Sequence, residues 1–95
     1  MAAAARKEII SMSFDAAVVR EQGVSFAVIV VRSGVVGVPS RREEVAAGFR
    51  TKFPDLPIIL MSQDSRGRPT FWGRTDIVRF LSRIAVHRLP WRRYR

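Results

Sequence analysis

Residues 56–81 constrain the fold of this chain more than any other part of the sequence. They read as an apolar strand (LPIILMS), a charged turn (QDSRGR), an aromatic strand (PTFWG) and a helix whose pattern continues to residue 84 (RTDIVRFLSRI). Asp64 and Gly67 suit the first and last positions of a type I turn, and Pro69 suits the start of an edge strand because it lacks a backbone donor. We therefore predict a β-hairpin packed against a helix.

The part of the chain before this stretch supplies one more strand and two helices. Residues 24–32 (VSFAVIVVR) are rich in β-branched residues and apolar on both alternating faces, which is typical of a strand covered on both sides. Residues 40–53 form a predicted helix that starts with the capping-box sequence SRRE and is followed by Pro54. A shorter helix is predicted to begin at Ser13, which can cap it.

The predicted order of elements is α–β–α–β–β–α. A crossover through the helix at 40–53 makes the strands on either side of it parallel. The hairpin makes the third strand antiparallel, and Thr75 is predicted to cap the last helix. The predicted fold class is therefore α/β (α+β), with a small mixed three-stranded sheet, helices packed on the sheet, and residues 69–73 at one edge.

The length and composition are those of a single globular domain with one modest core. The chain has 95 residues, of which 47% are hydrophobic and 26% are charged. We divide it into a flexible leader (1–12), a single α/β domain (13–86) and a basic C-terminal tail (87–95). No apolar run reaches the length of a membrane span and no secretory signal is visible, so the expected location is cytoplasmic.

The sequence excludes several kinds of chemistry. It contains no cysteine, which rules out disulfides, thiolate metal sites, CxxC redox chemistry and cysteine nucleophiles. The single histidine, His87, argues against a histidine-based zinc site or a Ser/His/Asp triad. We predict no catalytic residue, metal or cofactor, and we expect a non-enzymatic protein. An enzyme would need a pocket in which Asp64 or Asp76 meets His87.

The net charge of +9 is concentrated in one half of the chain. Residues 1–48 contain six basic and five acidic side chains, whereas residues 49–95 contain eleven basic and three acidic ones. This asymmetry indicates an anionic partner: an acidic protein, a nucleic acid or a membrane surface. An alternative is compositional drift with simple solubility, because fifteen of the seventeen basic residues are arginines, as expected from a GC-rich coding sequence.

We predict that arginines of the cationic half converge on one face of the folded chain. Guanidinium groups bind phosphates and carboxylates, and exposed hairpins on rigid scaffolds often carry binding sites. The predicted anion-binding residues of the hairpin and last helix are Arg66, Arg68, Trp72, Arg74, Arg79 and Arg83. Alternation along the strand leaves open whether Phe71 or Trp72 points away from the core.

Two further segments are candidate anion sites. The end of the chain, WRRYR, adds Arg92 and Arg93 between aromatic rings, a combination suited to single-stranded nucleic acid. An alternative for this end is that its tryptophan packs onto the body. The first turn of the helix at 40–53 offers free amides beside Ser40, Arg41 and Arg42. The alternative is a solvated turn whose arginines pair with neighbouring glutamates.

The predicted function is a non-enzymatic binding module that contacts an unidentified acidic protein or nucleic acid through this arginine-rich face. The alternative is a nucleic-acid-binding protein that uses the same face together with the WRRYR end. Homodimerisation through the edge strand at residues 69–73 is also open, because an uncovered edge can pair with its copy.

The layout of residues 24–84 resembles the second half of the thioredoxin fold. The shared features are the order β–α–Pro-β–turn–β–helix, with Pro57 before a strand and Gly73 before the last helix. The resemblance implies that Pro57 is a cis proline beside a redox site. Because both cysteines and the first strand are missing, it implies a thioredoxin-like domain without redox activity. The chain also resembles small bacterial proteins, which implies no function.

Overall fold

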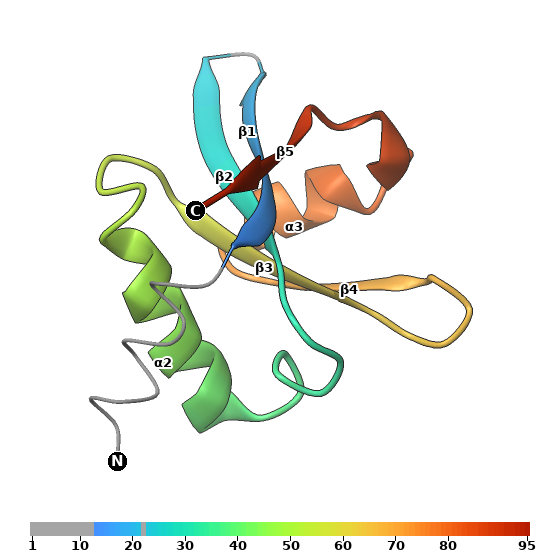
Figure 1. Ribbon diagram of the computed structural model, residues 1–95. Helices are drawn as coiled ribbons and strands as arrows, with labels where there is room; N and C mark the ends of the chain where they lie inside the picture. Colours follow the sequence, from blue (N-terminus) through green and yellow to red (C-terminus); the bar gives the residue numbers. More distant parts are fainter. Residues whose placement is uncertain (1–12, 22) are drawn as a thin grey trace.

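The computed structural model describes residues 13–21 and 23–95 as a five-stranded mixed sheet with a helix on each side (Figure 1). The strand order is β4-β3-β2-β1-β5, and only β2 and β3 are parallel neighbours. In chain order the elements are β1 (Phe14–Glu21), β2 (Val24–Val30), α2 (Pro39–Arg50), β3 (Ile58–Gln63), β4 (Pro69–Trp72), α3 (Thr75–Leu81), the 3-10 helix η1 (Val86–Arg88) and β5 (Trp91–Tyr94).

The central part of the sheet confirms the predicted mixed α and β architecture. β2, α2 and β3 form the expected parallel crossover, and β3 and β4 form the expected antiparallel hairpin. Within the hairpin turn, the backbone N–H of Gly67 donates to the carbonyl of Asp64 at 2.9 Å. β4 lies at one edge of the sheet, as its proline predicts.

The prediction of three strands is wrong, because two further strands extend the sheet. The residues predicted as a helix from Ser13 form the strand β1 instead. β1 is covered on both faces of the sheet, because the neighbouring residues Ala16 and Ala17 point to opposite faces and are both buried. Inside the stretch predicted as a basic tail, Trp91 pairs with Ala17 and Tyr94 pairs with Phe14, which makes β5 the second edge. The predicted leader, 1–12, lies outside the described residues.

The helix starts also differ from the prediction. α2 begins at Pro39, the first helical position, where the missing N–H of proline removes no hydrogen bond. Its N-cap is Val38 without a side-chain cap, so Ser40 does not open a capping box. The N-cap of α3 is Arg74, again without a side-chain cap, so the prediction that Thr75 caps it is wrong.

The two faces of the sheet are covered by helices of different lengths, and we name each face after its helix. α2 has twelve residues, about 18 Å, and α3 has seven, about 10 Å. The core of the α2 face contains a group of aromatic rings around Phe14, which lies 4.8 Å from Phe49 and 5.5 Å from Tyr94 between ring centroids. On the α3 face, Ile77 and Leu81 anchor the helix to the sheet.

Gly73 allows the chain to pass from β4 to α3 close to the sheet. Its φ is +153°, and a Cβ at this position would collide with the Cδ1 of Ile59 and lie 3.0 Å from the carbonyl oxygen of Ile58. Only glycine fits so near the β3 backbone. This close approach lets α3 begin directly over the sheet.

The described part of the chain has no helix with the length and apolar character needed to cross a membrane. It also has no cis peptide bond, so Pro57 is not the cis proline that the thioredoxin resemblance implies.

Candidate functional site

A groove crosses the α3 face where the short helix leaves the sheet uncovered. It has a volume of about 990 Å³, and all five strands contribute to its lining. The β3–β4 hairpin borders it at one end, and the segment from the end of α3 to β5 forms a wall. Its lining is mainly apolar and includes Val30, Met61, Phe71, Ile84, Val86 and Trp91.

The wall of the groove is fixed by the end of the chain. The indole Nε1 of Trp91 donates a hydrogen bond to the carbonyl oxygen of Val86 at 2.9 Å, which ties β5 to η1. Trp91 is half-buried and packs with the core of the α3 face. The alternative in which this tryptophan packs onto the body is therefore confirmed, and the ring forms part of the groove.

Polar side chains lie at the border of the groove, and two of them form an ion pair or a hydrogen bond with a neighbouring residue. Asp15 pairs with the Nε of Arg93 at 3.0 Å, and the Oγ of Ser82 donates to the carbonyl of Val78 at 2.9 Å. His87 also lines the groove. Among the residues that the structure describes, no hydrogen bond joins Ser82, His87 and Asp15, and neither Asp64 nor Asp76 is a lining residue.

The hairpin turn beside the groove is organised by the carboxylate of Asp64. Its Oδ1 accepts hydrogen bonds from the backbone N–H groups of Arg66 and Arg68, both at 2.9 Å, and its Oδ2 accepts one from the Nε of Arg68 at 3.1 Å. These bonds, above all the backbone N–H of Arg68, lower the pKa of Asp64 from its ordinary value. The carboxylate therefore rigidifies the turn that carries both arginines.

A second ion pair lies at the start of α3. The guanidinium of Arg74 donates two hydrogen bonds to the carboxylate of Asp76, at 2.9 Å and 2.6 Å. This pairing lowers the pKa of Asp76 to about 2 and raises the pKa of Arg74. Arg74 is thus occupied by its own carboxylate.

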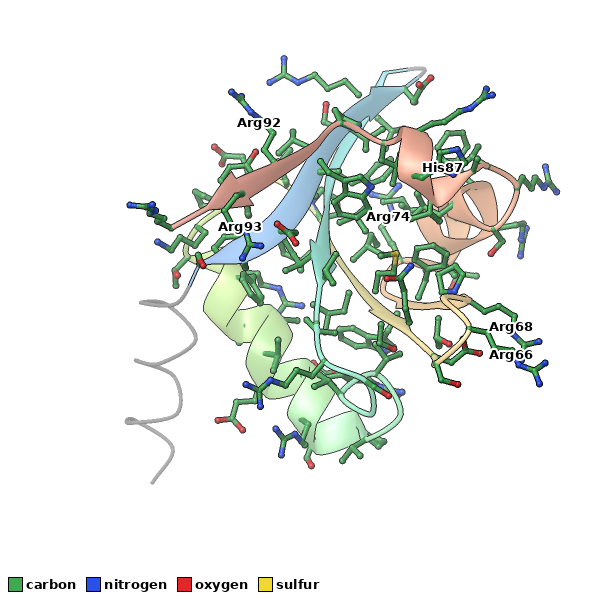
Figure 2. The ribbon with its side chains drawn as sticks, turned by 45° about the vertical axis from the view of Figure 1, so that its right-hand side comes forward. Arg66, Arg68, Arg74, His87, Arg92 and Arg93 are labelled. Atoms are coloured by element: carbon green, nitrogen blue, oxygen red, sulfur yellow. The ribbon has the colours of Figure 1, made fainter. Side chains whose placement is uncertain are left out.

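The arginines predicted to form one face are not all brought together. Figure 2 shows Arg66 and Arg68 at the end of the hairpin, on the right of the view, whereas Arg92 and Arg93 lie on β5, on the left. Alternation along β5 also directs these two side chains to opposite faces of the sheet.

The cationic excess lies in residues 64–89, which contain six arginines and two aspartates. Both aspartates are in the ion pairs described above, with Arg68 and Arg74. The other four arginines are exposed and have no carboxylate within ion-pair distance among residues 13–21 and 23–95. We call them the unpaired arginines: Arg66, Arg79, Arg83 and Arg88.

Trp72 does not lie at the centre of an arginine-bearing face, contrary to the prediction from the sequence. Its side chain packs on the α2 face, where the guanidinium carbon of Arg42 lies 5.3 Å from the ring centroid. The neighbouring Phe71 is the aromatic residue of β4 that faces the groove.

The predicted secondary anion site at the start of α2 is only partly open. Ser40 and Arg41 are exposed, but Arg42 is half-buried and its Nη1 donates to the carbonyl of Val36 at 3.1 Å. Together with its position over Trp72, this bond makes Arg42 a part of the fold. Its Nε is buried without a hydrogen-bond partner.

In the part of the chain that the structure describes, no group of three or more His, Asp or Glu side chains could hold a metal ion. Comparisons with protein-family models, with curated proteins and with solved structures found no match. The thioredoxin resemblance and the cytoplasmic location therefore stay predictions.

Sequence reasoning missed the apolar lining of the groove. The available signal was the run of apolar residues after the last helical turn, Ile84, Val86 and Leu89, which a seven-residue helix cannot bury under itself.

Proposed function

We propose that this chain is a binding module that engages an anionic partner on the α3 face, at the groove and the unpaired arginines near it. The observation that carries the proposal is the combination of an apolar groove with an excess of arginines that no carboxylate of the described residues neutralises. Binding hot spots are enriched in tryptophan, tyrosine and arginine, and the buried centre of an interface is more apolar than its rim. The α3 face offers Trp91, an apolar lining and unpaired arginines.

A nucleic-acid-binding function is the second candidate, supported by the same arginines. Arg92 supports it less, because it alternates with Trp91 along β5 and so lies on the α2 face with Tyr94. The rings of the WRRYR end favour it less. Trp91 is hydrogen-bonded to Val86, and Tyr94 stacks on Phe14 within the α2 face, so both rings serve the fold. Base stacking requires aromatic faces that are open to the strand.

Homodimerisation through β4 also stays a proposal. β4 is an edge strand, and its outer backbone groups can pair with a second copy. Its four residues would provide a short contact.

The test compares charge reversal on the two faces of the sheet. A fluorescein-labelled poly-glutamate peptide and a labelled oligo-dT of equal length serve as probes in anisotropy titrations at low salt. Arg66→Glu with Arg83→Glu should weaken binding at least tenfold. The matched control, Arg41→Glu with Arg50→Glu on α2, should change binding less than twofold, because these arginines lie across the sheet.

Equal losses in both double variants would contradict the proposal. A salt series separates the two candidate functions, because nucleic-acid binding weakens steeply as salt rises through counterion release.

A further inference from the structure

We infer that the partner is an acidic amphipathic helix, whose apolar side chains enter the groove while its carboxylates meet the arginines on the groove border. The inference rests on the proposed function, since it names the class of anion that the α3 face accepts. It follows from the lining of the groove, from the positions of the unpaired arginines and from the incomplete helical layer on this face.

The lining requires an occupant with apolar side chains. Val30, Phe71 and Ile84 are each half-buried in the free chain and line the groove together. Covering them removes apolar area from water, which stabilises a complex by roughly 25 cal/mol per Å². Single-stranded nucleic acid needs open aromatic faces on which its bases stack. The apolar lining is mostly aliphatic, and it therefore suits a protein segment with leucine or phenylalanine side chains better.

Three of the four unpaired arginines are adjacent in sequence to residues that line the groove. Arg66 precedes Gly67, Arg83 lies between Ser82 and Ile84, and Arg88 follows His87. The hairpin and the α3–η1 wall therefore both carry unpaired positive charge, which we call the bordering arginines: Arg66, Arg83 and Arg88. Carboxylates on the flanks of an apolar stripe complement this arrangement.

The shape of the α3 face favours a helix. On the α2 face a twelve-residue helix completes the second layer, but on the α3 face the seven-residue helix covers only part of the sheet. The groove crosses five strands, and at about 4.8 Å between strands this is about 19 Å. A helix of about three and a half turns has this length. Docked beside α3, it would complete the layer.

The experiment uses the full chain with Trp72→Phe, which leaves Trp91 of the groove as the single tryptophan. The probe is a labelled 15-residue helical peptide with leucine at i, i+3, i+4 and i+7 positions and glutamate on the flanks. Matched probes replace every leucine by serine, replace every glutamate by glutamine, or are single-stranded oligo-dT of 15 nucleotides. Anisotropy gives affinity, and Trp91 emission reports contact with the groove.

The leucine–glutamate peptide should bind at least tenfold more tightly than each matched probe and should shift the Trp91 emission to shorter wavelength. Val86→Ser in the groove should weaken it at least fivefold, whereas Val45→Ser, half-buried on the α2 face, should not. Each variant is shown to be folded by circular dichroism and by a backbone amide NMR spectrum that matches the spectrum of the wild type.

Three outcomes would overturn the inference, and they are distinguishable. If the serine peptide or oligo-dT binds as tightly and leaves the Trp91 emission unchanged, the helix inference fails while the proposed anion binding stands. If the glutamine peptide binds as tightly, the bordering arginines have no role and the inference also fails. If no anionic probe binds at low salt, the proposed function itself fails.

Discussion

A twelve-residue helix covers one face of the sheet, and a seven-residue helix lies on the other. The α2 face closes over a group of aromatic rings. Its charges are nearly balanced, because residues 39–55, which include α2 and the turn after it, contain four basic and three acidic residues. The segment 64–89 contains six arginines and two aspartates, and the groove lies beside it. Both faces have a buried core, but only the α3 face leaves apolar and cationic surface exposed, and this is where we propose that the partner binds.

Arginines are used differently on the two faces. Arg42 is built into the α2 face by its hydrogen bond to Val36 and its position over Trp72. The bordering arginines Arg66, Arg83 and Arg88 are exposed and have no such contacts among the residues described. Charge alone therefore does not identify the surface that we propose for binding, because the environment of each guanidinium decides whether it is free to contact a partner.

The largest expected effect is a difference in stability between the closed face and the open one. Phe49→Ala should lower the free energy of unfolding by about 3–5 kcal/mol, because Phe49 is only 5% exposed and packs edge-on against Phe14. Phe71→Ala, in the groove, should lower it by about 1–2 kcal/mol, because part of its ring is already in water. Urea denaturation measures both, and equal losses would contradict the contrast between the faces.

The next effect concerns the approach of α3 to the sheet. Gly73→Ala should lower the free energy of unfolding by about 2–4 kcal/mol, because a Cβ collides with Ile59 and the backbone conformation disfavours other residues. Gly34→Ala is the control, since its φ is also positive, at +92°, but nothing lies within 4 Å of the added Cβ. We expect about 1 kcal/mol there. A loss at Gly73 no larger than that at Gly34 would show that the close approach is unimportant.

A smaller effect separates the two kinds of arginine. Arg42→Gln should lower the free energy of unfolding by about 1–2 kcal/mol, because it removes a cation–π contact and a hydrogen bond. Arg83→Gln should change it by less than about 0.5 kcal/mol, as is usual for exposed residues. Thermal and urea unfolding of both variants provide the measurement. If Arg83→Gln lowered the free energy of unfolding as much as Arg42→Gln, Arg83 would stabilise the fold and would not be free to contact a partner.

The smallest effect is the titration of the ion pair at the start of α3. Arg74 holds the pKa of Asp76 at about 2, below its ordinary 3.8. Because the folded-state pKa is lowered, the stabilisation by this pair is fully present above pH 3.8 and is lost as the pH falls toward 2. Carboxyl-carbon NMR titration should show this pKa, and Arg74→Gln should return it toward 3.8. A pKa unchanged by that substitution would remove Arg74 as the cause.

The sequence predicted the middle of the fold better than its ends. The strand at 24–32, the crossover helix and the hairpin each carry local signals, namely β-branched runs, helical periodicity and turn residues, and the structure contains all three. β1 was missed because Ala16 and Ala17 are compatible with a helix, and only pairing with β2 and β5 makes the segment a strand. Tertiary pairing of this kind leaves no local signal.

The candidate site was predictable only in part. The charge asymmetry pointed to the cationic half, where Arg68 lines the groove and Arg66 precedes the lining residue Gly67. The groove itself depends on how far α3 reaches over the sheet, which follows from the Gly73 contact and from the end of α3 at Leu81. Only the structure shows that Trp72 lies outside the groove and that Phe71 lines it. Strand alternation places the two rings on opposite faces but does not say which face carries the groove.

The most direct test of the account is to map the binding surface by backbone amide chemical shifts of the full chain during titration with the leucine–glutamate helical peptide. We predict that the largest changes fall on the α3 face, at Gly67, Phe71 and Ile84, together with the indole N–H of Trp91. Residues of α2 such as Arg41 and Arg50 should change little. Shifts concentrated on α2, or spread evenly over both faces, would contradict the claim that the groove is the binding surface.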